Sequence, residues 1–393
     1  MDRREFIRRC AIIGAGMPLL SSMLMSCEDE SIVANFDVNF SGKVLVIGAG
    51  AAGLIAGHIL NKHHVDFEIL EASSVFGGRV KKIDNFADFP IDLGAEWIHD
   101  EPKILSDLLN DPSETRSIEF IVYNPKTVYV WSNNKLKKRN LFSNFYSEYK
   151  FKNTTWYDYF DQFIVPSFSD KIRYNKPVNS IDYSADKVVV TTADNDSFEA
   201  DKILLTVPAT MLQQNKIAFT PSLPTDKVAA FNEINMPDGI KVFMEFSERF
   251  YPDIVYEGSP LSGSTDGEKV YYDAAFGKNA SKNIFALFAV GEPSAEIANL
   301  PNDAAIIEFV LNELDQMFEG KASATYVKHV IQNWTKEPYI QGSYSHNDVD
   351  IEVLARPLDE KIYFAGEAYS ELASATVHGA GASAYVALEQ LLK

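Results

Sequence analysis

A glycine-rich segment near the start of the chain has the residue types and the spacing that hold a dinucleotide. It reads Gly48, Ala49, Gly50, Ala51, Ala52 and Gly53. In such a G-x-G-x-x-G pattern the first glycine permits a tight turn, the second lets the backbone approach a pyrophosphate, and the third lets a helix pack closely on a strand. A helix that begins here directs its free N–H groups and its positive dipole end at the phosphates.

The elements around this loop are the ones that such a site requires. Residues 43–47 form a short, continuous apolar run that predicts a buried parallel strand. An alanine-rich stretch to Leu60 predicts the helix, and residues 66–70 predict a second strand. Glu71 then follows the first glycine by about 20 residues, where a carboxylate accepts hydrogen bonds from a ribose. The sequence therefore predicts a β-α-β unit that binds FAD or NAD rather than NADP.

The residues after Glu71 narrow the choice of cofactor. A Gly-Gly-Arg run ending at Arg79 lets the backbone pass near a flat ring, while the guanidinium reaches an oxygen of a phosphate or a flavin. Residues 92–99 follow with Asp-Leu-Gly-Ala-Glu-Trp-Ile-His. The two segments resemble the flavin-containing amine oxidase family, which includes the monoamine and polyamine oxidases. The resemblance implies FAD along this edge. Its binding is expected to be non-covalent, because the two cysteines, Cys10 and Cys27, both belong to the expected leader and leave no free thiol for cysteinyl attachment. One departure is Val75, where the family usually has a second arginine.

The resemblance continues along the chain in the order of the family's motifs. Residues 176–208 match its hairpin and returning strand, and residues 239–250 match the strand with the active-site lysine. Residues 334–344, 362–367 and 375–380 match its closing segments. The resemblance implies the following cofactor-binding residues: Gly48, Gly50, Ala51, Ala52, Gly53, Glu71, Ala72, Gly78, Arg79, Gly94, Ala95, Glu96, Trp97, Val178, Gly366, Glu367, Ala375, Thr376 and Val377.

Two residues are candidates for catalysis. Lys241 lies in a strand of alternating character, and the motif match implies a buried lysine near flavin N5 that holds a water and polarises the ring. Burial lowers the pKa of a lysine, because a low dielectric disfavours its charged form. Tyr344 matches one of two tyrosines that flank the amine, whose ring faces attract cations; packing in the core is the alternative. The second tyrosine position is Thr376, which is closer to the polyamine-oxidase branch.

The closing motif also makes physical sense by itself. A strand is expected to end at Phe364, and a helix is expected from about Thr376 to Leu392. The N-terminus of that helix would direct about half a unit of positive charge at the pyrimidine edge of the flavin. Reduced flavin is anionic at that edge, so the dipole favours reduction of the cofactor.

Composition excludes several classes of protein. The chain has 393 residues, of which 46% are hydrophobic and 23% are charged, as in an ordinary globular protein. Its net charge of −19 argues against binding of nucleic acid, because lysine and arginine supply most of the affinity for phosphates. Its two cysteines cannot make a disulfide scaffold. No pair of histidines has ligand spacing with carboxylates or thiols, so no metal is predicted.

Residues 1–27 are predicted to be an export signal. Four arginines between residues 3 and 9 precede an apolar stretch that is short for a bilayer span. The arginines resemble a twin-arginine signal, and residues 24–27 resemble a lipobox, in which Cys27 is lipidated and becomes the new N-terminus. The alternative is a retained anchor helix. The first interpretation predicts a protein of the bacterial cell envelope, lipid-anchored at Cys27 and followed by an acidic tether at 28–40.

The expected fold class is α/β combined with α+β. A doubly wound, Rossmann-like FAD-binding domain is expected at 41–100, 170–235 and 355–393, so it is discontinuous in sequence. An inserted substrate domain of sheet and helices is expected at 101–169 and 236–354.

Within the substrate domain, residues 117–131 and 269–290 predict strands, and residues 303–318 predict an amphipathic helix. The first insert is shorter than in the family, so the pocket is expected either to be open or to be completed by a partner chain.

The motifs together predict a FAD-dependent amine oxidase. A neutral amine would transfer hydride from its α-carbon to flavin N5, water would hydrolyse the imine, and O2 or another acceptor would reoxidise the flavin. Three alternatives stay open. An amino-acid oxidase would need an arginine for the substrate carboxylate, with Arg173, Arg249 and Arg356 as candidates. The others are a C–C desaturase or porphyrinogen-type oxidase and a flavin-binding lipoprotein without turnover.

Overall fold

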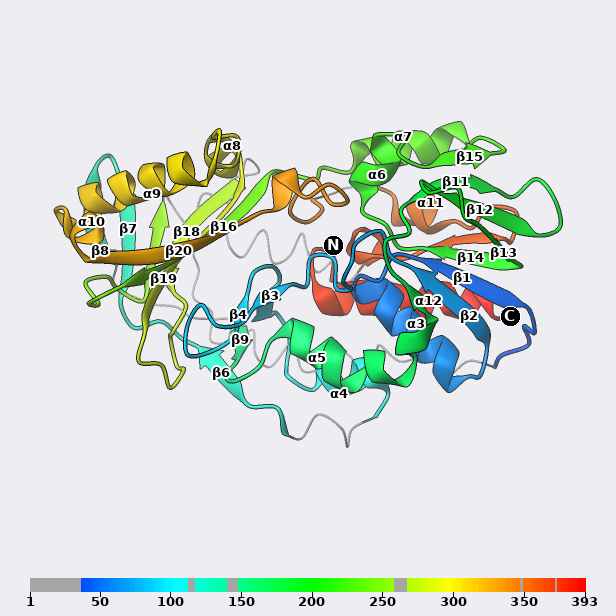
Figure 1. Cartoon of the computed structure of the whole chain (residues 1–393), viewed down its shortest axis with the longest axis horizontal. Helices are drawn as coiled ribbons and strands as arrows, with labels where there is room; N and C mark the ends of the chain where they lie inside the picture. Colours follow the sequence, from blue (N-terminus) through cyan, green and yellow to red (C-terminus); the bar gives the residue numbers. More distant parts are fainter. Residues whose placement is uncertain (1–36, 112–116, 140–147, 258–266, 347–348, 372) are drawn as a thin grey trace, which may run out of the picture.

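Two large sheets at opposite ends of an elongated molecule organise the chain (Figure 1). The computed structural model describes residues 37–111, 117–139, 148–257, 267–346, 349–371 and 373–393. The expected export signal, the anchor at Cys27 and most of the tether lie outside these residues. Within the described ranges, every helix is too short or too polar to span a bilayer.

A five-stranded parallel sheet forms one end of the molecule. Its spatial order is β10 (Ile172–Arg173), β2 (Asp66–Leu70), β1 (Lys43–Ile47), β14 (Lys202–Leu205) and β21 (Ile362–Phe364). Both β1 and β2 occupy the residues that the sequence predicts, and helix α3 (Ala51–Lys62) connects them. The strands come from segments far apart in sequence, because parallel neighbours need a crossover between them.

Different layers cover the two faces of this parallel sheet. Helices α3 and α12 (Val377–Leu391) pack together on one face, where they share an apolar core with β1. The other face packs against a four-stranded sheet of β13 (Ser197–Ala200), β12 (Val188–Thr192), β11 (Val178–Asp182) and β15 (Ala218–Thr220). The expected Rossmann-like fold is therefore confirmed, with a mixed sheet, in which β11 and β15 are parallel, as one of its covering layers.

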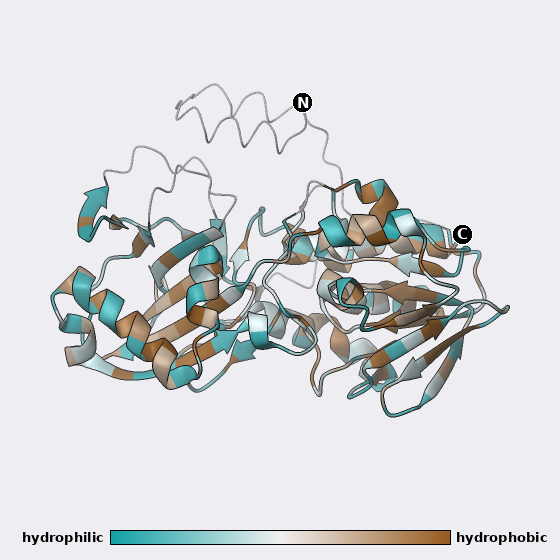
Figure 2. Ribbon diagram, turned by 90° about the horizontal axis from the view of Figure 1, so that it is seen from above, coloured by the Kyte–Doolittle hydropathy of each residue, from teal (hydrophilic) through white to brown (hydrophobic). Residues whose placement is uncertain are grey.

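A seven-stranded sheet forms the other end of the molecule. Its order is β20 (Tyr326–Asn333), β16 (Gly239–Phe246), β19 (Asn283–Gly291), β18 (Gly267–Asp273), β17 (Ile254–Glu257), β7 (Val128–Ser132) and β8 (Lys135–Arg139). Helices α8 (Glu292–Ala298) and α9 (Asp303–Phe318) share its core. α9 occupies the predicted residues, and β16 is buried along its whole length. In Figure 2 the strands of both ends carry much of the hydrophobic colour.

Shorter elements complete the described part of the chain. They are β3 (Lys82–Ile83), β4 (Ile91–Asp92), β5 (Trp97–Ile98), α4 (Ile104–Leu109), β6 (Phe120–Tyr123), β9 (Glu148–Phe151), α5 (Trp156–Phe163), α6 (Ala209–Gln213), α7 (Thr225–Glu233), α10 (Lys321–Thr325) and α11 (Ile351–Ala355). The segment predicted as strand at 117–131 divides into β6, which pairs with β9, and β7, which joins the seven-stranded sheet. The segment 269–290 becomes the antiparallel pair β18 and β19.

The helices of the insert at 101–169 lie on the nucleotide-binding side of the molecule. Helices α4 and α5 pack there in the same core as β1, α3 and α12. The Tyr159 hydroxyl on α5 donates to the Leu105 carbonyl at 2.7 Å, and the Tyr385 hydroxyl on α12 donates to the Leu108 carbonyl at 3.0 Å. Apolar periodicity shows that a helix has a buried face, but it does not show which layer covers that face.

Removal of the Leu108 side chain tests this placement of α4. Leu108 is fully buried, and its Cδ2 lies 2.5 Å from the point that a Cβ on Gly381 of α12 would occupy. We expect Leu108→Ala to lower the free energy of unfolding by about 2–5 kcal/mol, measured by urea denaturation. The control is Val122→Ala on β6, whose side chain is exposed and whose loss should cost less than about 0.5 kcal/mol. Equal stability of the two variants would contradict the packing.

Candidate functional site

A cavity of about 1080 Å³ extends between the two large sheets, from the β1–α3 loop to strands β16–β19. Small-molecule pockets usually measure ~300–1,000 Å³, so this cavity has room for a large cofactor together with a substrate. All of the predicted site residues line it except Gly53. The sequence motifs therefore converge on one space.

The glycine loop shapes the nucleotide end of the cavity. Gly48 has a φ of +106°, a left-handed conformation that favours glycine. A Cβ on Gly53 would lie 1.9 Å from the Gly48 carbonyl oxygen, which explains why Gly53 serves packing and does not line the cavity. A Cβ on Gly50 would meet nothing within 4 Å. Gly50 is the N-cap of α3, and it has no side chain that could accept from the N–H groups of the first turn. These N–H groups therefore face open space.

Glu71 follows β2 at the same end and is buried. Its carboxylate accepts hydrogen bonds from the backbone N–H groups of Ala49, at 2.7 Å, and of Ser73, at 2.8 Å. Burial raises the pKa of Glu71, although these backbone donors act in the opposite direction. The carboxylate thus fixes the glycine loop against β2, and it also lines the cavity, as expected for a ribose acceptor.

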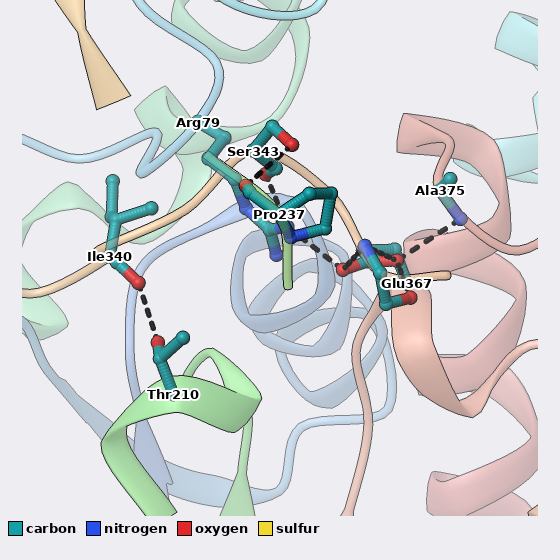
Figure 3. Close-up of polar contacts among 8 residues, drawn as sticks. Arg79, Thr210, Pro237, Ile340, Ser343, Glu367 and Ala375 are labelled. Carbon is teal, nitrogen blue, oxygen red and sulfur yellow. Dashed lines mark hydrogen bonds and ion pairs between the residues drawn. The ribbon is translucent and has the colours of Figure 1, made fainter. Parts of the chain in front are cut away.

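A second carboxylate, Glu367, joins three separate segments at the middle of the cavity (Figure 3). It accepts from Arg79 Nη1 at 2.8 Å, from the Ser345 hydroxyl and backbone, and from the Ala375 backbone N–H at 3.1 Å. Burial acts to raise the pKa of Glu367, but Arg79 and Ser345 outweigh burial and hold it below its usual range. Arg79 also donates to the Ser343 carbonyl at 3.0 Å. Its guanidinium is therefore fixed in place from two sides.

Helix α12 begins beside Glu367 and lines the cavity with its first residues. The Thr376 hydroxyl accepts from the Gly379 N–H at 2.9 Å, so Thr376 caps the helix. Ala375, just before the cap, has a φ of +63°, which is rare for a residue with a side chain. Its N–H bond to Glu367 helps to hold this conformation. The expected helix with its positive end at the cavity is present over Val377–Leu391.

Lys241 lies on β16 and lines the cavity, but its side chain is 2% exposed. Its ammonium donates to Glu96 Oε2 at 2.7 Å, to the Gly94 carbonyl at 2.9 Å and to the Asp92 carbonyl at 3.4 Å. Burial lowers the pKa of Lys241, as the sequence predicts, although Glu96 acts against burial. The three acceptors match the three ammonium hydrogens. In this arrangement a protonated Lys241 has no hydrogen left to donate to a water, and its expected place beside flavin N5 stays a prediction.

Acidic and aromatic side chains line the end of the cavity away from the glycine loop. The Tyr344 hydroxyl donates to Glu268 Oε1 at 3.2 Å, and His99 Nδ1 lies 3.0 Å from Glu148 Oε1. Tyr123, Tyr256 and Phe288 complete this wall. Burial by the surrounding protein raises the pKa of Glu268, and the nearby Glu148 contributes in the same direction. Tyr344 thus faces the cavity and does not belong to a closed core.

The sequence did not identify Glu268, Glu148 or Lys150 as site residues. Glu268 and Glu148 lie on strands outside the recognised motifs, and Lys150 meets Glu96 through strand pairing across the chain. No local signal marks such residues, because only the register of distant strands brings them together. His378 is buried in α12, where burial lowers its pKa to about 4. Among the described residues, no group of three or more His, Cys, Asp or Glu side chains could hold a metal ion.

Comparison with known proteins decides the family. Residues 160–391 match the family described as flavin containing amine oxidoreductase, and residues 46–111 match the NAD(P)-binding Rossmann-like domain. The chain belongs to the flavin containing amine oxidoreductase family. Its cofactor is FAD.

Individual relatives agree with the family and with the fold. Polyamine oxidase 4 of Oryza sativa subsp. japonica is 30% identical over 56% of this chain and 45% of its own length. Lysine-specific histone demethylase 1B of Mus musculus is 30% identical over 53% of this chain and 26% of its own length. The match thus spans less than half of each relative. A redesigned putrescine oxidase has a similar fold, with a TM-score of 0.69 at 14% identity, over 88% of this chain and 97% of that one.

The residues of the flavin containing amine oxidoreductase fold fit FAD in this chain. The open space in front of Gly50 and the free N–H groups of α3 suit a pyrophosphate. Glu71 suits a ribose, and Val178 lines the cavity beside it. The remaining lining, which includes Arg79, Gly94 and Lys241, offers the space between the two large sheets to a flat ring. FAD when bound supplies the two-electron acceptor.

Two glycine variants separate packing from cofactor binding. We expect Gly53→Ala to lower the thermal stability of the FAD-free protein, because its Cβ collides with the backbone of Gly48. Gly50→Ala should leave that stability nearly unchanged and weaken FAD binding about tenfold or more, because its Cβ fills the space for the pyrophosphate. Thermal unfolding and FAD titration by fluorescence measure the two effects. FAD affinity unchanged in Gly50→Ala would contradict the assigned position of the pyrophosphate.

Proposed function

We propose that this protein is a FAD-dependent amine oxidase whose substrate carries a second cationic group. The observation that carries the proposal is the combination of a buried lysine, Lys241, with an acidic and aromatic cavity end at Glu268 and Tyr344. FAD held along Gly48, Gly50 and Glu71 would supply the acceptor for the hydride that the carbon next to the amine nitrogen loses. The polyamine oxidase relative and the putrescine oxidase fold neighbour support an amine as the substrate.

The far end of the cavity suits a positive charge. Two carboxylates, Glu268 and Glu148, face it, and the ring faces of Tyr344 and Tyr256 attract cations through their quadrupoles. Lys241 is the basic residue that lines the cavity among β16–β19, and Glu96 compensates its charge. A distal ammonium on the substrate would therefore find partners there, while the reacting amine lies toward Lys241.

The first alternative, an amino-acid oxidase, lacks support from the candidate arginines. Arg173 pairs with Glu68, Arg249 pairs with Asp253 and Asp273, and Arg356 pairs with Asp226. None of the three lines the cavity. A desaturase or porphyrinogen-type oxidase would act on a large apolar substrate, and the carboxylates of this wall are unsuited to that.

Anaerobic mixing with a panel of amines tests the proposal directly. Diamines and polyamines should bleach the absorbance of the bound oxidised flavin faster than monoamines of equal chain length, because a second ammonium adds binding energy. Amino acids should bleach it slowly, since Arg79, which lines the cavity, is already paired with Glu367 and the Ser343 carbonyl. Air should restore the colour if O2 is the acceptor. A flavin that no amine bleaches would reject the proposed function.

Lys241→Met tests the assigned position of the lysine. We expect the rate of flavin reduction or reoxidation to fall about 10²-fold or more, because a positioned acid or base contributes that much to proton transfer. FAD content of the purified variant is the control for folding. A variant that retains flavin and full rates would show that Lys241 takes no part in either step, whereas a wild-type protein that no substrate reduces would favour the third alternative, a protein that holds flavin without turnover.

Glu268→Gln tests the distal cation site. We expect KM for a diamine to rise about tenfold or more, with little change for a monoamine, because a charged hydrogen bond is lost. The raised pKa of Glu268 also predicts that diamine affinity falls as pH decreases through that pKa, since the carboxylate form present above it is lost. The variant should lack this pH dependence. Equal losses for monoamine and diamine would show that Glu268 only supports the fold.

We propose in addition that the protein is exported to the bacterial cell envelope and lipid-anchored at Cys27. The support is the sequence of residues 1–27 alone. Metabolic labelling with a radioactive fatty acid should label the wild type and leave Cys27→Ser unlabelled. A labelled Cys27→Ser variant would contradict this proposal.

A further inference from the structure

A cluster of three buried charges surrounds the reacting part of the cavity. Glu96 lies between two lysines, with Lys241 at its Oε2 atom and Lys150 at its Oε1 atom. The side chains of both lysines are 2% exposed and that of Glu96 is 7% exposed. Two cations and one anion in such a volume require an explanation, because burial of unbalanced charge is costly.

Strand pairing brings Lys150 to this place. β5 and β9 are antiparallel, and Lys150 pairs in register with Trp97, the neighbour of Glu96. The Lys150 ammonium lies 5.1 Å from the Trp97 ring centre and 5.0 Å from the Tyr272 ring centre. The Lys241 ammonium lies 5.2 Å from the same Trp97 ring. Both cations therefore use one carboxylate and one pair of aromatic side chains.

The two lysines depend on Glu96 to different degrees. Lys241 also donates to the carbonyls of Gly94 and Asp92. For Lys150, the ion pair with Glu96 is its one described polar contact. Lys150 thus draws on the charge of Glu96 more strongly than Lys241 does. The Tyr272 hydroxyl donates to Glu96 as well, which leaves less of the negative charge for Lys241.

Other titratable groups face Lys241 from the elements packed around it. Asp92 comes from β4, and burial together with the charge of Glu96 raises its pKa well above its usual value, which favours its protonated form. The neighbouring strands β19 and β20 place Phe288 and Gln332 opposite Lys241, and neither is charged. The titratable groups that act on Lys241 or on Glu96 include Asp92, Lys150 and Tyr272. Lys278 lies behind them, where it lines a small cavity with Asp92, Glu96 and Lys150 and interacts with all three charges.

We propose that Glu96 and Lys150 are positioning residues that control whether Lys241 carries a proton in the cavity. Glu96 favours the ammonium, and Lys150 takes up part of the charge of Glu96 and so lets Lys241 release its proton. A neutral Lys241 regains a lone pair that can accept a hydrogen bond from a water or an amine. This inference rests on the proposed function, because it assumes that Lys241 lies beside the reacting amine.

The inference predicts that two variants shift the pKa of Lys241 in opposite directions. Lysine labelled with ¹³C at Cε reports the pKa of Lys241 by NMR in the substrate-free, FAD-loaded protein, and Lys241→Arg assigns its signal. Glu96→Gln should weaken proton binding to Lys241 by about tenfold or more, and Lys150→Met should strengthen it by a similar factor. The pH profile of flavin reduction by an amine should move in the same two directions.

Two further variants provide the controls. Tyr272→Phe removes a hydrogen bond to Glu96 but no charge, so the titration of Lys241 should move much less. Lys150→Arg keeps the positive charge, so the titration of Lys241 should stay as in the wild type. If Lys150→Met does not fold, Lys150→Gln removes the charge in its place. Shifts in the same direction for Glu96→Gln and Lys150→Met, or no shift in either, would overturn the inference. Opposite shifts in a protein that no amine reduces would uphold the inference and reject the proposed function.

Discussion

The ion pair between Lys241 and Glu96 connects the two ends of the molecule. Lys241 belongs to the seven-stranded sheet, whereas Glu96 belongs to the segment that follows the nucleotide-binding loop. The same ammonium binds the carbonyl of Gly94, so the sheet is fixed to the backbone as well as to a side chain. A buried ion pair is stable only when its remaining groups find partners, and Lys150 and Tyr272 provide them. The contact therefore joins two segments that both line the cavity.

Glu367 makes a comparable connection nearer the C-terminus. It joins Arg79, the segment at Ser345 and the turn at Ala375, which come from three distant parts of the chain. The left-handed Ala375 just before α12 is a costly conformation, and one oxygen of Glu367 compensates part of that cost by accepting its N–H. Two carboxylates, Glu96 and Glu367, therefore hold the cavity wall in the arrangement that the glycine loop alone could not impose.

The sequence predicted the local parts of this structure and missed the parts that depend on strand register. The segments with a strong period or motif, such as 43–53 and 303–318, form the expected elements, because short-range sterics and burial decide them. The helices of the insert at 101–169 pack on the nucleotide-binding layer, which no local pattern reveals. Lys150 reaches Glu96 only through the pairing of β5 with β9. The family resemblance predicted Lys241 as a site residue, but it did not predict that Lys150 would lie beside Glu96.

The charges along the cavity favour one orientation of any flexible diamine that enters it. At the β16 end, two lysines share one carboxylate, so this region carries a net positive charge when both are protonated. At the other end, the carboxyl groups of Glu268 and Glu148 line the cavity. A protonated amine is repelled from the first region and attracted to the second. In the proposed function, the amine that loses hydride must be neutral, because a protonated nitrogen has no lone pair to stabilise the carbon it leaves. The same charge distribution therefore selects both the orientation of the substrate and the protonation state of its reacting end.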